Sequence, residues 1–390
     1  MAMNTLSPKS GRPEIEIVLI GLGNIGRRFL QILDHKRDSL RTRYGLAFKL
    51  VGAADSRGAA IAQAGLDLAA VVRLKREGRS VAEYPAYGHP AMSAQRMLDQ
   101  VQADVLCEAS PVNLESGEPG LSCMRAAIHK GMHVVTTNKG PLVLAYAELA
   151  ALAREKGVRL RFCGTVAGGL PAINLGQRDL AGATIERIEA VPNLTTSFIL
   201  EKMTQGLTYE RALAEAQAQG CAEADPSLDV QGWDAANKLV ILANSVLGVP
   251  ATLQDVNVQG IVALTSADLA EARAQGKVIK LVATAVRRNP AAACQDEGDD
   301  GEHVRPDSYT FTVAPTPLPA DHPLAQLNGQ QMGIVYYTDI YGTISAAILE
   351  KEPIPSAAAL LRDMLSIYMD TPAAPETGAL SVSHQEPFQT

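Results

Sequence analysis

Four carboxylates and one lysine lie close together in one stretch of this sequence, residues 222–238. They are Glu223, Asp225, Asp229, Asp234 and Lys238. From about residue 230 apolar residues recur at helical spacing, so Asp234 and Lys238 are expected on one side of a helix. A lone pair of this kind is usually a solvated ion pair. Here the acids stand beside Ala, Pro, Gly and the only Trp, which favours a site for a small cationic or zwitterionic ligand, with a lysine that transfers a proton.

A glycine-rich turn near the N-terminus indicates that a dinucleotide also binds. Residues 15–20 form a β-prone apolar run, and an amphipathic helical pattern follows the turn. The turn contains Gly21, Gly23, Asn24, Ile25 and Gly26. Glycines between a buried strand and a helix let a pyrophosphate approach the N-terminus of that helix. We therefore expect these five residues to bind NAD or NADP.

The next expected strand, residues 48–54, is followed by two residues that bear on the choice of cofactor. Asp55 is an acid of the kind that bonds the ribose hydroxyls of NAD, whereas Arg57 suits the 2′-phosphate of NADP. Because both residue types are present, NAD and NADP both remain open. For Arg57 the alternative is a solvated loop charge.

Two further expected strands end in polar residues. The strand over residues 104–109 is followed by Ser110, and the strand over 133–137 is followed by Asn138 and Lys139. In open α/β sheets ligands lie beyond the carboxyl ends of the strands, which is where Ser110 and Lys139 fall. We expect both residues to lie near the cofactor, although an isolated lysine after a strand is often only a surface residue.

The alternation of strands and helices predicts an α/β protein with a Rossmann-type, doubly wound parallel sheet. We assign residues 14–163 to this dinucleotide-binding domain and expect residues 330–369 to complete it. Residues 164–329 form a second, α+β domain, in which strands at 185–194, 257–264, 278–287 and 308–313 build an antiparallel sheet. Residues 1–13 and 370–390 are expected to be flexible ends, and residues 289–307 an acidic solvated loop.

Composition excludes several classes of protein. The net charge of −7 argues against nucleic acid and anionic membranes as partners. No apolar run is long enough to span a bilayer, and the N-terminus does not have the apolar core of a signal peptide. The five cysteines show no paired spacing, which indicates reduced thiols in a cytoplasmic protein. No Cys/His cluster suggests zinc.

Several separated motifs together resemble those of the homoserine dehydrogenase family, over about residues 15–365. These motifs are Gly21-Leu22-Gly23-Asn24-Ile25-Gly26, Val134-Val135-Thr136-Thr137-Asn138-Lys139-Gly140-Pro141, Val166-Ala167-Gly168-Gly169-Leu170-Pro171 and the stretch 222–238. The resemblance implies reversible NAD(P)-dependent interconversion of L-homoserine and L-aspartate 4-semialdehyde, a step toward threonine and methionine. It also implies a homodimer built through the sheet of the second domain.

The resemblance further implies a role for individual residues. The catalytic pair would be Lys238, as acid/base, and Lys139, as its partner near the nicotinamide. The substrate would be bound by Glu223, Asp229 and Asp234 and touched by Thr195. A structural monovalent cation, Na⁺, would be held by the backbone carbonyls of Cys163, Val166, Gly168 and Leu170.

These roles agree with the chemistry of the residue types. Reduction of an aldehyde needs a proton for the developing alkoxide, and a nearby cation stabilises that charge. Two lysines in one desolvated site lower each other's pKa, so that one can transfer a proton near neutrality. The ammonium group of an amino-acid substrate requires carboxylates, which Glu223 and its neighbours provide.

The chain departs from the usual family pattern at four places. They are Cys163, Leu194, Cys221 and residues 349–352. The acid–base residues are unaffected, and two alternatives stay open. One is a related NAD(P)-dependent dehydrogenase for another small amino or hydroxy acid, and the other is a non-catalytic ligand sensor on the same fold. Retention of both lysines favours an enzyme, because binding alone does not need a proton relay.

Overall fold

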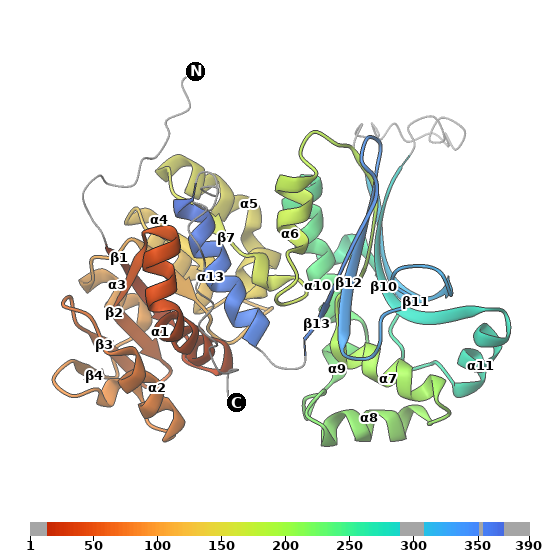
Figure 1. Ribbon diagram of the computed structural model, residues 1–390, viewed down its shortest axis with the longest axis horizontal. Coiled ribbons are helices and arrows are strands. Elements are labelled where there is room, and N and C mark those ends of the chain that lie inside the picture. The colour runs from red at the N-terminus through yellow and green to blue at the C-terminus, as the bar shows by residue number, and fades with distance from the viewer. Residues whose placement is uncertain (1–13, 289–307, 351–353, 370–390) are drawn as a thin grey trace.

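The computed structural model describes residues 14–288, 308–350 and 354–369, which form two bodies side by side, each built around one β-sheet (Figure 1). The expected flexible ends, 1–13 and 370–390, and the expected acidic loop, 289–307, lie outside the described residues. In the described ranges, no helix combines the length and apolarity needed to cross a membrane.

The first body confirms the expected Rossmann-type sheet. Its seven strands lie in the order β4-β3-β2-β1-β5-β6-β7. The parallel strands are β1 (Glu14–Ile20), β2 (Ala47–Asp55), β5 (Val105–Glu108), β6 (His133–Thr136) and β7 (Leu160–Arg161). The short strands β3 (Gly58–Ile61) and β4 (Gly88–Pro90) extend one edge antiparallel, and sequence reasoning missed them. The helices are α1 (Asn24–Tyr44), α2 (Leu68–Arg76), α3 (Ala94–Gln100), α4 (Gly120–His129) and α5 (Lys139–Lys156).

The apolar run of β1 explains why it lies at the centre of this sheet. Ile17, Val18 and Leu19 are completely buried, as a strand covered by helices on both faces requires. On α1, Phe29 and Leu33 are four residues apart, as helical spacing requires, and are buried in the core of the same body. This packing fixes the glycine turn between β1 and α1 at the carboxyl edge of the sheet.

The second body contains a six-stranded sheet in the order β13-β12-β8-β10-β11-β9. Its strands are β8 (Ile185–Val191), β9 (Val256–Val258), β10 (Lys277–Arg287), β11 (Tyr309–Pro319), β12 (Gln331–Thr338) and β13 (Gly342–Leu349). The expectation of a wholly antiparallel sheet is wrong, because β9 pairs parallel with β11. The helices are α6 (Ala172–Asn174), α7 (Leu194–Thr204), α8 (Tyr209–Ala218), α9 (Ser227–Val230), α10 (Trp233–Leu242) and α11 (Ser266–Ala274).

Residues 330–369 do not return to the first body as one unit, which corrects the expected domain boundary. Strands β12 and β13 form a hairpin in the second sheet, where β12 also pairs with β8. Only α13 (Ile354–Tyr368) packs on α1, and its Ala357, Leu360 and Met364 are buried in the core of the first body. Gly342, with φ of 68°, begins β13 directly after the tight turn of this hairpin, a conformation that glycine adopts readily.

Candidate active site

Lys139 follows the end of β6 and lies at the boundary between the two bodies. Asn138 caps α5, since its Oδ1 accepts the backbone N–H of Gly140 at 3.1 Å. Its Nδ2 donates to Ser110 Oγ at 3.3 Å, which joins the carboxyl ends of β5 and β6. Helix α5 packs on α10 of the second body, so Lys139, the first residue of α5, reaches across the boundary.

Asp234 lies between two lysines that come from different bodies. Lys139 donates from Nζ to Asp234 Oδ1. Lys238 donates from Nζ to Asp234 Oδ2 at 2.6 Å and to the carbonyl of Pro192 at 2.6 Å. Asp234 is only 7% exposed. The expected ion pair between Asp234 and Lys238 on one face of a helix is therefore present, with Lys139 as a third member.

The electrostatics of this cluster follow from its burial. Burial alone would raise the pKa of the Asp234 carboxyl, but the charges of Lys238 and Lys139 and their hydrogen bonds hold that pKa well below its usual range. Burial lowers the pKa of the Lys238 ammonium; the charge of Asp234 opposes this effect and that of Lys139 adds to it. Lys238 therefore loses its proton more easily than an exposed lysine, which suits a group that donates and accepts a proton.

Asn193, which sequence reasoning missed, connects two of the carboxylates. It precedes α7, and its Nδ2 donates to Asp229 Oδ1 at 2.6 Å and to Asp234 Oδ2 at 2.7 Å. Both oxygens of Asp234 are thus occupied by donors from the protein. The expected contact of Asp234 with substrate stays a prediction, because its carboxylate holds three protein donors of the roughly four that a carboxylate accepts. The sequence Asn193-Leu194-Thr195-Thr196 places a residue typical of helix N-caps at a strand-to-helix junction, and this pattern could have identified Asn193.

The remaining substrate-binding candidates lie on α7, on α9 and in the loop between α8 and α9. Asp229 lies on α9, and one of its carboxylate oxygens accepts a hydrogen bond from the amide of Asn193. Thr195 is buried on α7, and its hydroxyl donates to the carbonyl of Cys221 at 2.9 Å, which ties α7 to the start of the acidic stretch. Glu223 is exposed, and within the described ranges its carboxylate makes no hydrogen bond or ion pair. Glu223 is therefore the acid of the stretch that is available to a ligand.

The glycine turn has the space that a pyrophosphate requires. Gly21 has φ of 91°, and a Cβ there would lie 2.2 Å from the carbonyl oxygen of Ala109, so the turn is pressed against the residue before Ser110. A Cβ on Gly26 would lie 2.0 Å from the carbonyl oxygen of Gly21. Among the residues that the structure describes, none would contact a Cβ on Gly23, and none caps the start of α1 with its side chain. The first N–H groups of α1 are therefore open to an anion.

Asp55 does not present a carboxylate to a ribose. Its Oδ1 accepts the N–H of Arg57 at 2.9 Å and the hydroxyl of Ser80 at 2.8 Å. Its Oδ2 accepts Lys75 Nζ at 2.6 Å and the N–H of Val81 at 3.0 Å. Four donors saturate the lone pairs of a carboxylate, so the expected ribose contact of Asp55 disagrees with the structure, and Asp55 anchors the loop instead. Arg57 is exposed, and one of its guanidinium nitrogens donates a hydrogen bond to the carbonyl of Gly78.

The loop from Cys163 to Leu170 is held by charged side chains. Glu350, which is buried, accepts the N–H of Gly169 at 3.1 Å, and Arg362 donates to the Gly169 carbonyl at 2.8 Å. Asp363 accepts the N–H of Cys163 at 2.7 Å, while its other carboxylate oxygen is buried and has no hydrogen-bond partner among the described residues. In the part of the chain that the structure describes, no group of three or more His, Cys, Asp or Glu could hold a metal ion.

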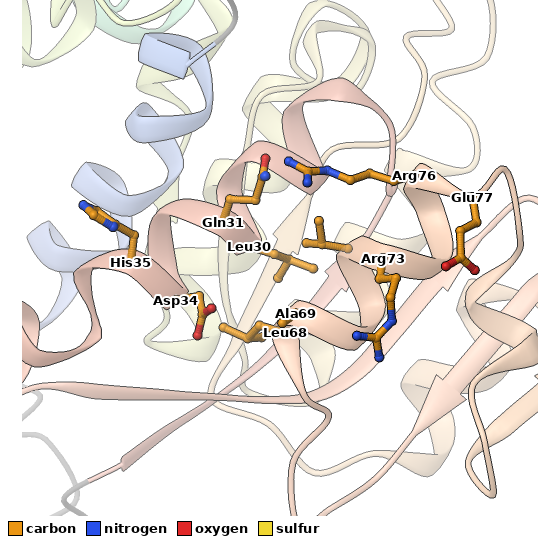
Figure 2. A pocket seen from close by; sticks show the side chains of 10 residues that line it. Leu30, Gln31, Asp34, His35, Leu68, Ala69, Arg73, Arg76 and Glu77 are labelled. Atoms are coloured by element: carbon orange, nitrogen blue, oxygen red, sulfur yellow. The ribbon is translucent and has the colours of Figure 1, made fainter. Parts of the chain in front are cut away.

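A separate groove of about 620 Å³ lies between α1 and α2 (Figure 2). Figure 2 shows Gln31, Asp34 and His35 on one side, with Arg73 and Glu77 on the other. The residues that line this groove are distinct from those of the lysine cluster and of the glycine turn. We therefore place the candidate active site at the boundary between the two bodies and not in this groove.

A doubly wound sheet with an open glycine turn, together with a lysine pair at the boundary between the two bodies, defines a two-domain nicotinamide-dependent oxidoreductase. Two family models match the chain, "Homoserine dehydrogenase" over residues 171–365 and "Homoserine dehydrogenase, NAD binding domain" over residues 21–163. The chain belongs to the homoserine dehydrogenase family.

Individual relatives cover nearly the whole chain. A homoserine dehydrogenase of Methanocaldococcus jannaschii is 37% identical over 92% of this chain and 99% of its own length. An NAD(+)-dependent homoserine dehydrogenase of Pseudomonas canavaninivorans is 35% identical over 91% of this chain and 96% of its own. The structure of a hyperthermophilic archaeal homoserine dehydrogenase in complex with NADPH is similar with a TM-score of 0.74 at 26% identity, covering 92% of this chain and 99% of that one.

Proposed function

We propose that this enzyme interconverts L-homoserine and L-aspartate 4-semialdehyde, with Lys238 and Lys139 as its catalytic pair. The observation that supports this most is the cluster of Lys139, buried Asp234 and Lys238, which joins the two bodies. In this proposal residues 14–163 with α13 form the dinucleotide-binding domain. Residues 164–350 form the substrate-binding domain.

Lys238 is the proposed proton donor and acceptor. Two of its N–H groups are directed at Asp234 and at the carbonyl of Pro192, which leaves the third for the oxygen of the substrate. During aldehyde reduction Nζ gives a proton to the developing alkoxide, and during homoserine oxidation it takes the hydroxyl proton. The Lys139 ammonium, held beside it by Asp234, stabilises negative charge on the same oxygen.

The substrate's amino-acid end requires different partners. We propose that Glu223, whose carboxylate is unpaired in the described ranges, binds the substrate ammonium, together with the outer oxygen of Asp229. Thr195, whose hydroxyl donates to the carbonyl of Cys221 two residues before Glu223, is proposed to touch the substrate.

The first domain fits a dinucleotide. We propose that Gly21, Gly23, Asn24, Ile25 and Gly26 hold the pyrophosphate, since Gly23 faces open space and the start of α1 has no side-chain cap. Ser110 and Lys139, at the carboxyl ends of β5 and β6, then lie near the nicotinamide. A nicotinamide cofactor supplies hydride transfer when it is bound.

Substrate choice is tested by homoserine-dependent formation of NADH or NADPH, followed by absorbance. We expect L-homoserine to be oxidised with a higher kcat/KM than other small hydroxy or amino acids. The alternative, a related dehydrogenase with another substrate, would show a higher kcat/KM for a different compound. A sensor would bind the cofactor and oxidise none of them.

Arg57→Ala is expected to raise the KM for NADPH about five- to tenfold and to leave the KM for NADH unchanged. Arg57 is exposed at the end of β2 and has guanidinium nitrogens left for a 2′-phosphate, whereas Asp55 is saturated. One charge-assisted contact at a partly exposed site has about this effect. Arg37→Ala, an exposed arginine paired with Asp34 on α1, serves as the matched control. An equal change for both cofactors would show that Arg57 does not contact the phosphate.

We further propose that the carbonyls of Cys163, Val166, Gly168 and Leu170 bind a monovalent cation, Na⁺. The buried carboxylate of Glu350 and the unpartnered oxygen of Asp363 give this loop negative charge, although Arg362 offsets part of it. A cation that binds the folded state raises its melting temperature. We expect the enzyme to melt at a higher temperature in sodium chloride than in choline chloride of equal ionic strength, and equal melting temperatures would contradict the site.

We also propose that the enzyme is a homodimer in the cytoplasm. Leu349 on β13, an edge strand of the second sheet, and Ile340 in the adjoining turn are exposed apolar residues that a second copy would cover. Four described cysteines are free thiols, as a reducing compartment favours. Sedimentation equilibrium at micromolar concentration tests the dimer.

A further inference from the structure

We infer that Asn193 is a positioning residue, whose amide holds the carboxylates of Asp229 and Asp234 side by side. The inference rests on the proposed function, since it assigns a task within the same site. Asn193 is 5% exposed and lies in the connection from β8 to α7.

The structure fixes the orientation of this amide. Asn193 is the N-cap of α7, and its Oδ1 accepts the N–H of Thr196 at 2.9 Å and the hydroxyl of Thr196 at 3.1 Å. Because an amide nitrogen cannot accept these bonds, Nδ2 must face away from the helix. There its two hydrogens go to Asp229 at 2.6 Å and to Asp234 at 2.7 Å. The helix cap therefore determines where the donor points.

The two carboxylates need such a donor because they bond to the same nitrogen from different helices. Carboxylates this close raise each other's pKa unless positive charge or donors separate them. The charged groups that act on the pair are Lys139 on α5 and Lys238 on α10. Both lysines bond to Asp234. In the described ranges, the hydrogen bond to the carboxylate of Asp229 comes from Asn193.

The substitution Asn193→Asp tests the positioning of the two carboxylates separately from the capping of α7. Aspartate caps a helix as well as asparagine does, but it replaces the two N–H donors with a third carboxylate. We expect the KM for L-homoserine to rise at least about tenfold, as for loss of a hydrogen bond to a charged group. The acid limb of kcat/KM should move to higher pH, because the crowded carboxylates bind a proton more readily. Thr208→Ala removes the cap of the neighbouring helix α8 and should change neither quantity.

Thermal melting against pH gives a second readout that needs no substrate. In Asn193→Asp the raised carboxyl pKa means that the folded state binds more protons than the unfolded chain, so lowering the pH stabilises it. Its deficit in melting temperature relative to the wild type should be largest at alkaline pH and shrink toward acid pH. An unchanged KM and pH profile, or a deficit independent of pH, would overturn the inference. A wild type that does not oxidise homoserine would refute the proposed function instead, and the melting test would still apply.

Discussion

Lys238→Ala is expected to lower turnover by roughly 10²–10⁴-fold, the usual range for loss of a general acid–base group. Lys238 is the lysine whose Nζ is buried against Asp234 and Pro192 with one N–H left for the substrate oxygen. Binding of NADPH should be unchanged, because the glycine turn lies on the other body. Saturating kinetics of homoserine oxidation and a fluorescence titration with NADPH measure the two effects separately.

Two further variants are compared with Lys238→Ala. Lys238→Arg keeps the positive charge beside Asp234 but cannot give up its proton near neutrality, so it should be nearly as inactive as the alanine variant. Lys202→Ala removes another helical lysine of the same body, one paired with Glu215 at 2.5 Å outside the cluster, and should keep normal turnover. Near-normal turnover in a folded Lys238→Ala protein would refute the proposed proton transfer.

Asp234→Asn should affect both activity and stability. Without the carboxylate, burial and the charge of Lys139 lower the pKa of Lys238, and only the weaker attraction of Asp229 opposes them. The protonated form, which aldehyde reduction requires, is then lost at lower pH, so the alkaline limb of that reaction should move toward neutrality. Breaking a buried ion pair costs about 3–5 kcal/mol, and we expect the free energy of unfolding to fall by that order.

Denaturant unfolding and the pH dependence of kcat test these two effects. Asp225→Asn is the matched control, because Asp225 is an exposed acid of the same stretch, bonded to Ser227. It should leave both quantities nearly unchanged. If Asp234→Asn behaved like Asp225→Asn, Asp234 would be no more than a surface acid and the three-residue cluster would have no role in catalysis.

Local sequence patterns were enough to predict two features, the first domain and the Asp234–Lys238 pair of the lysine cluster. The glycine turn and the helical spacing of Asp234 and Lys238 are encoded within a few residues, and the structure has both. The contact between Lys139 and Asp234 joins residues 95 apart, so spacing could not reveal it. Only the packing of α5 on α10 creates it.

The errors have similar causes. Asp55 follows its strand as a ribose-binding acid would, but Lys75 and Ser80, which reach it from α2 and beyond, occupy its oxygens. Asn193 was overlooked because its role depends on two carboxylates brought to it by α9 and α10. Strand order in the second sheet also depends on long-range pairing, and the parallel contact of β9 with β11 has no local signature.

The most direct test of the proposed site compares two aldehydes that differ only in the ammonium group. Wild-type enzyme and Glu223→Gln are assayed for NADPH oxidation with L-aspartate 4-semialdehyde and with succinate semialdehyde. We expect the wild type to prefer the amino aldehyde by at least about tenfold in kcat/KM, as for one charged hydrogen bond, and Glu223→Gln to lose most of that preference. Equal kcat/KM values for the two aldehydes in the wild type would contradict the proposal that the acidic stretch recognises an amino-acid substrate.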